Sequence, residues 1–130
     1  MVDVLELRHR CLFFKDFIAG VEWVDHAYIS SGGKYQSTAT ATSHYTNNAI
    51  LLKPGTYKLV GFSYQEDAGA SNKTNFRIHA YNASDKWQRQ ITYKLIDWLS
   101  PVDIPFTLTS DTYVRLSIAR KFVGHLIRTK

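Results

Sequence analysis

One stretch of the chain holds the residues whose types and spacing best suit binding chemistry: Arg77, His79, Tyr81, Trp87 and Arg89. The first three alternate along a run of period-two hydrophobicity, which predicts that they lie on one face of a β-strand. Trp87 and Arg89 follow a polar turn. A sugar has an apolar face and a polar rim, so an aromatic plane beside hydrogen-bond donors is suited to hold it. These residues form the candidate glycan-binding site.

Trp87 also has a structural interpretation, and so does Trp98 in the insertion at 96–100. Either ring could cap one end of the fold or pack on a partner subunit, because most aromatic residues of a small β-protein serve in its interior. The sequence leaves both interpretations of Trp87 open.

The chain contains no motif typical of an enzyme, such as a phosphate-binding glycine loop, a Gly-x-Ser-x-Gly elbow or a His-Glu-x-x-His pair. We therefore expect no catalytic residue and no cofactor. The five histidines are scattered, and only His26 adjoins an acid, Asp25, so no metal site is expected. Glu66 and Asp67 could help to hold a calcium ion, but adjacent acids in a loop are more often simply solvated.

Short alternating stretches separated by turn residues must position these side chains. Strands are predicted at 57–64, 75–81, 104–109 and 113–118. The first has apolar residues on both faces and is expected to be covered on both sides, whereas the second is expected to be half exposed. Regularly spaced short strands with few helix signals predict an all-β protein, an antiparallel β-sandwich or barrel.

Composition is consistent with one folded domain. The chain has 130 residues, a mass of 14.9 kDa and 45% hydrophobic residues, enough for a core without a metal or disulfide. The single cysteine, Cys11, lies in an apolar run and is expected to be buried. The first residues carry acids where a signal peptide carries basic residues, and no apolar run reaches membrane-spanning length, so neither an export signal nor a membrane span is expected.

The net charge of +5 is concentrated at one end of the chain. Residues 115–130 include five basic residues and no acid, and the rest has equal numbers of both. An end cluster without base-stacking elements does not favour nucleic acid as a partner. The cluster is either a solvated terminus or a segment that docks on an acidic protein surface or an anionic glycan. The candidate docking residues are the apolar Leu12, Phe13 and Phe14 and the basic Arg120, Lys121, Arg128 and Lys130.

The order of several short motifs resembles the carbohydrate-binding-type β-sandwich modules of bacteriophage tail, baseplate and fibre proteins. The motifs are YISSGGK at 28–34, SHY at 43–45, ILLKPGTY at 50–57, RIHAY at 77–81, DKW at 85–87, PFTL at 105–108 and YVRLSI at 113–118. The resemblance covers about residues 27–119. It implies a jelly-roll-like fold, a place in a virion and, often, adhesion to host glycans.

Together these observations predict an antiparallel, jelly-roll-like β-sandwich at 27–119. It is preceded by an extended N-terminal arm and first strand at 1–26 and followed by a basic C-terminal strand in the segment 120–130. The expected function is that of a non-enzymatic accessory protein of a phage virion, a capsid decoration or a tail or fibre subunit made in the host cytoplasm. Its expected partners are other virion proteins, a second copy of the chain or host surface glycans. The alternative is a free-standing glycan-binding module or receptor-binding adhesin.

Overall fold

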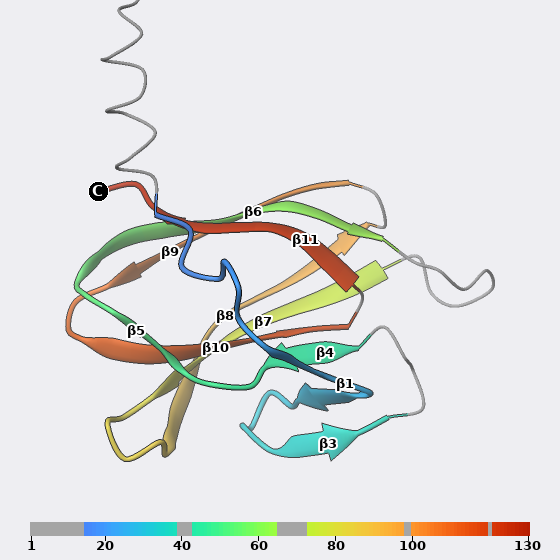
Figure 1. The fold of residues 1–130 in the computed structure, drawn as a ribbon, viewed down its shortest axis with the longest axis horizontal. Helices are drawn as coiled ribbons and strands as arrows, with labels where there is room; N and C mark the ends of the chain where they lie inside the picture. The colour runs from blue at the N-terminus through green and yellow to red at the C-terminus, as the bar shows by residue number, and fades with distance from the viewer. Residues whose placement is uncertain (1–14, 39–42, 65–72, 98–99, 120) are drawn as a thin grey trace, which may run out of the picture.

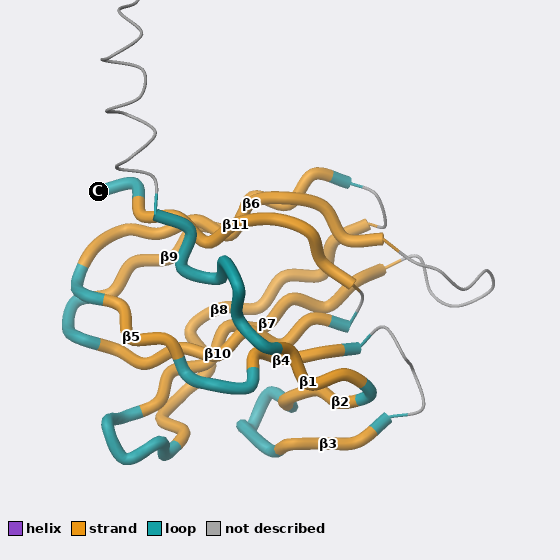
Figure 2. Tube along the Cα trace, viewed as in Figure 1, coloured by secondary structure: helices purple, strands orange, loops and turns teal. Residues whose placement is uncertain are grey.

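The computed structural model describes residues 15–38, 43–64, 73–97, 100–119 and 121–130, and every regular element in them is a β-strand (Figures 1 and 2). In chain order the strands are β1 (Trp23–Asp25), β2 (Ala27–Ile29), β3 (Tyr35–Ser37), β4 (His44–Thr46), β5 (Ile50–Leu52), β6 (Gly55–Tyr64), β7 (Lys73–Tyr81), β8 (Trp87–Asp97), β9 (Pro101–Leu108), β10 (Thr112–Ile118) and β11 (Lys121–Arg128). The prediction of an all-β protein is confirmed.

The strands form two main antiparallel sheets and a separate hairpin. The larger sheet has the order β1-β4-β10-β7-β8, and β5 pairs with β10 beside β4. The smaller sheet has the order β11-β6-β9, and β2 pairs with β3 in the hairpin. Figure 1 shows the smaller sheet above the larger one, with the hairpin at the lower right. This arrangement is an antiparallel β-sandwich.

The core lies between the two sheets and follows the predicted alternation. In β9 every second side chain is buried, beginning with Val102 and including Ile104. Facing them are the fully buried Ile78 of β7 and Leu116 of β10. Period-two patterning therefore places the apolar side chains of both sheets in one interior.

The pair Pro54-Gly55 lies between two consecutive strands, β5 of the larger sheet and β6 of the smaller one, so this turn carries the chain between layers. Two local expectations differ from the structure. The outer face of β6 is open, and Phe62 is 52% exposed. The outer face of β7, expected to be half exposed, is partly covered, and His79 is fully buried.

The basic C-terminal segment is part of the sandwich. Strand β11 pairs with β6 along its whole length, from Lys121 opposite Tyr64 to Arg128 opposite Tyr57. Leu126 of this strand is completely buried. Residues 121–128 thus form the predicted C-terminal strand, and this strand completes the smaller sheet, whereas the prediction set it apart from the β-sandwich.

Several expectations concern residues outside the described part of the chain. These are Cys11, Leu12, Phe13, Phe14, Glu66, Asp67, Trp98 and Arg120. Within the described residues, no helix is long and apolar enough to cross a membrane.

Candidate functional site

The outer face of the larger sheet carries the candidate site, and the β2–β3 hairpin divides this face into two parts. The hairpin lies against β10, where the backbone N–H of Ile29 donates to the hydroxyl of Ser117 at 2.9 Å. Ile29 is fully buried at this contact. Outward-facing residues of β7 therefore lie either beneath the hairpin or beside it.

The covered part contains His79 and Trp87. The indole Nε1–H of Trp87 donates to Nδ1 of His79 at 3.1 Å. Gly33, in the turn of the hairpin, lies against the face of the indole ring so closely that a Cβ there would overlap the ring atoms. Its φ of +85° also favours glycine. The Trp87 ring is therefore seated between the sheet and the hairpin rather than free to stack on a ligand.

Burial lowers the pKa of His79 from its usual 6.5 to about 4, an effect that the nearby Arg77 charge reinforces and the Ile29 backbone partly opposes. The imidazole is therefore neutral at pH 7, which is the state that accepts the hydrogen bond from Trp87.

Tyr81 is also covered, by a network that ties the hairpin to the sheet. Its hydroxyl lies 3.3 Å from that of Tyr35, and the guanidinium of Arg115 lies 4.6 Å from the centre of its ring. Arg115 donates to Asp85 at 2.6 Å and to the carbonyl of Asn47 at 3.1 Å. The Arg115 hydrogen bond lowers the pKa of Asp85, and burial raises that of Tyr81. This network has a structural role, because its polar groups form hydrogen bonds with one another rather than facing a ligand site.

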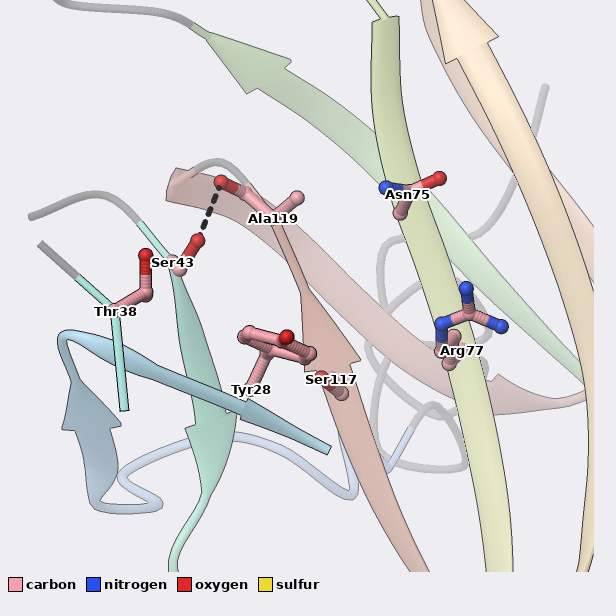
Figure 3. A pocket seen from close by; sticks show the side chains of 7 residues that line it. All are labelled: Tyr28, Thr38, Ser43, Asn75, Arg77, Ser117 and Ala119. Atoms are coloured by element: carbon pink, nitrogen blue, oxygen red, sulfur yellow. Dashed lines mark hydrogen bonds between the residues drawn. The ribbon is translucent and has the colours of Figure 1, made fainter. Parts of the chain in front are cut away.

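The open part of the face contains a cavity of about 280 Å³ beside the hairpin. Figure 3 shows the side chains that line it, which come from the hairpin, from β7 and β10, and from residues next to the ends of β3, β4 and β10. They are Tyr28, Thr38, Ser43, Asn75, Arg77, Ser117 and Ala119.

Arg77 and Asn75 form one wall of the cavity and are held by β8. Nη1 of Arg77 donates to Oε1 of Gln90 at 2.9 Å, and its guanidinium lies 4.4 Å from the centre of the Tyr93 ring. The Tyr93 hydroxyl donates to Oδ1 of Asn75 at 2.8 Å. One tyrosine thus positions both polar groups of this wall.

The opposite wall combines an aromatic ring with hydroxyl groups. Tyr28 extends from the hairpin, and its ring lies between the Ser43 side and the Arg77 side in Figure 3. The Ser43 hydroxyl donates to the carbonyl of Ala119 at 3.1 Å, which fixes its orientation. The cavity therefore offers an aromatic surface, a cation, an amide and hydroxyl groups within one small volume.

Of the five predicted glycan-binding residues, the structure brings only Arg77 to this cavity. His79 and Tyr81 are buried, Trp87 is half-buried under the hairpin, and Arg89 is exposed on β8 but does not line the cavity. The interpretation of this strand face as open was wrong for His79 and Tyr81, because a hairpin formed by residues far away in the sequence covers them.

Asn75 and Tyr28 line the cavity but are not among the predicted site residues. Asn75 was recognisable, because it shares the period-two face of Arg77. Tyr28 had no local signal, since its place beside Arg77 depends on how the hairpin packs.

The predicted docking residues at the C-terminal end have partly structural roles. Arg128 donates from Nε to the carbonyl of Lys130 at 2.9 Å and from Nη2 to that of Pro54 at 2.8 Å. Its guanidinium thereby fastens the end of the chain to the start of β6. Lys130 is exposed, and Lys121 begins β11.

Among the described residues, no group of three or more histidine, cysteine or acidic side chains could hold a metal ion. Comparison of the chain with protein-family models, with curated proteins and with solved structures finds no match.

Proposed function

We propose that this protein is a non-enzymatic, carbohydrate-binding β-sandwich module of a bacteriophage particle, and that it binds a glycan in the cavity between Tyr28 and Arg77. The observation that carries the proposal is the pairing of an aromatic wall with a wall of positioned polar groups. The resemblance of the motif order to phage modules supports the place in a virion, and jelly-roll-like connectivity is part of the same proposal.

The size and chemistry of the cavity suit a short glycan. Its volume of about 280 Å³ is just below the roughly 300–1,000 Å³ range of small-molecule sites, so a short glycan suits it better than a long one. The ring of Tyr28 can contact the apolar face of a sugar, and Asn75 and Arg77 can bind its oxygen atoms.

A glycan array with the full chain, followed by calorimetry with the best glycan, tests this proposal. Tyr28→Leu and Asn75→Ala should each weaken binding at least tenfold, because each removes one wall contact. Gln36→Ala is the matched control. Gln36 lines a second groove on the same hairpin, of about 430 Å³, and its loss should leave affinity unchanged.

Two results would contradict the proposal. One is the absence of any glycan signal from a correctly folded wild type. The other is a loss of binding in Gln36→Ala that Tyr28→Leu and Asn75→Ala do not share, which would move the site to the second groove.

A second candidate function is that of an accessory subunit that packs on another virion protein or on its own copy. The observation in its favour is the outer face of the smaller sheet, where Phe62 and Val123 are opposite each other in register. They are 52% and 63% exposed. Neighbouring exposed apolar residues are typical of interaction surfaces.

Sedimentation velocity of the wild type and of the double variant Phe62→Ser, Val123→Thr tests whether this face binds a second copy of the chain. A wild type that stays monomeric at high concentration would contradict self-association through this face.

A further inference from the structure

We infer that the glycan bound in this cavity is acidic, and that Arg77 binds a carboxylate on its sugar ring. The inference rests on the proposed function, because it specifies the ligand of the same cavity. The charge of the lining and the orientation of its hydrogen-bonding groups both favour such a ligand.

The lining of the cavity is positively charged. Arg77 is the one ionised side chain among the seven lining residues, and none of the seven is an acid. The groups that position Arg77 are the amide of Gln90 and the ring of Tyr93, both of which are neutral. Its charge is thus held in place without being neutralised by these contacts, which favours an anion as the ligand.

The polar groups beside Arg77 also present donors. Since Oδ1 of Asn75 accepts from Tyr93, the amide nitrogen is the part of Asn75 that remains for the cavity. Figure 3 shows this nitrogen on the side of Ala119 and Ser43 and the oxygen on the far side. A guanidinium has five N–H donors, and Gln90 accepts from Nη1. A wall of donors suits a ligand group that only accepts, which a carboxylate does.

The planar geometry of Arg77 favours a carboxylate over a lone hydroxyl. Its guanidinium lies 4.4 Å from the centre of the Tyr93 ring and donates to Gln90, and these two contacts hold it in place before the ligand arrives. A fixed guanidinium can donate two parallel hydrogen bonds to a carboxylate, and such charge-assisted pairs are about twice as strong as neutral ones. Asn75 is placed to bind a neighbouring ring oxygen.

The test uses pairs of glycans that differ only in charge. Oligosaccharides ending in glucuronic acid are compared with their methyl esters, and glucose 1-phosphate serves as a second anion. We expect the wild type to bind the acid at least tenfold more tightly than the ester. Arg77→Gln should remove this preference, so that the acid and its ester bind with similar affinity.

Arg89→Gln is the matched control, because it removes the same charge from an exposed position of β8 outside the cavity. It should retain the preference. Arg77→Lys should show an intermediate preference, since it retains the charge but loses the planar fork. Thermal unfolding confirms that each variant is folded before its affinity is compared.

The outcomes separate this inference from the proposed function. Equal binding of acid and ester by the wild type overturns the inference and leaves the glycan site standing. Equal losses in Arg77→Gln and Arg89→Gln also overturn it, because the effect would then arise from overall charge. Binding of glucose 1-phosphate as tight as that of the acid overturns the choice of a carboxylate. A folded wild type that binds none of the glycans overturns the proposed function itself.

Discussion

The two ends of the outward face of β7 differ in what covers them. At one end, Asn75 and Arg77 border a cavity and are held by Tyr93 from the neighbouring strand. At the other end, His79 and Tyr81 are fully or almost fully buried. The four residues alternate on the same strand, yet half of them form a wall that a ligand can reach and half form an interior.

The hairpin is the cause of this difference. Gly33 in its turn contacts the Trp87 ring, and Tyr35 on β3 reaches the hydroxyl of Tyr81. The cavity lies beside the hairpin, where Tyr28 lines it from the side opposite Arg77. The comparison teaches that one polar strand face of a small module can have two roles. Part of it binds the hairpin that packs on the sheet, and the rest lines the cavity beside that hairpin.

The largest expected effect is at the covered end. Trp87→Ala should lower the free energy of unfolding by about 3 kcal/mol, near the lower limit for a buried Trp→Ala change because the ring is half-buried. The change also leaves Nδ1 of His79 without its donor. Urea unfolding measures this, with Gln88→Ala, an exposed neighbour, as the control. A loss below about 1 kcal/mol would show that the ring is free to act as a binding surface.

The buried imidazole should make stability depend on pH. His79 has its pKa lowered from 6.5 to about 4, so between these values the unfolded chain binds a proton that the native protein does not. The free energy of unfolding should therefore decrease as pH falls from 6.5 towards 4, by up to about 3 kcal/mol. NMR titration of the His79 ring measures the native pKa directly. A native pKa near 6.5 would contradict burial as the dominant cause.

Gly33→Ala should lower the free energy of unfolding by about 2 kcal/mol by disturbing the packing of the hairpin on the sheet. The new methyl group would overlap the Trp87 ring, and the backbone is held at a positive φ. Gly32→Ala is a close control, since a Cβ there meets no atom within 4 Å. Urea unfolding of both variants tests the difference. Equal stability of the Gly33→Ala and Gly32→Ala variants would show that the hairpin turn is not in close contact with the Trp87 ring.

The smallest effect on stability is expected at the open end. Tyr93 is 41% exposed, so Tyr93→Leu should change the free energy of unfolding by less than about 0.5 kcal/mol. The same change removes the support of both Asn75 and Arg77, and glycan affinity should fall several-fold in calorimetry. A large loss of stability with unchanged affinity would reverse the roles assigned to the two ends.

The sequence alone was sufficient for the fold class and for much of the core. Alternation of apolar residues in strands such as β9 and β10 identified which side chains share a face, and the structure places Ile104 and Leu116 inside as expected. It also identified Arg77 as a binding candidate, a role that remains a prediction.

Only the tertiary structure decided which faces of the strands are covered by other segments. The strand at 57–64, apolar on both faces, has Phe62 exposed, whereas the strand at 75–81, polar on one face, has His79 fully buried. Period-two patterning is a property of neighbouring residues, but burial depends on segments that are distant in the sequence. The cavity at Arg77 forms because the hairpin that carries Tyr28 packs on β10 and ends beside Arg77, and no local pattern in β7 contains that information.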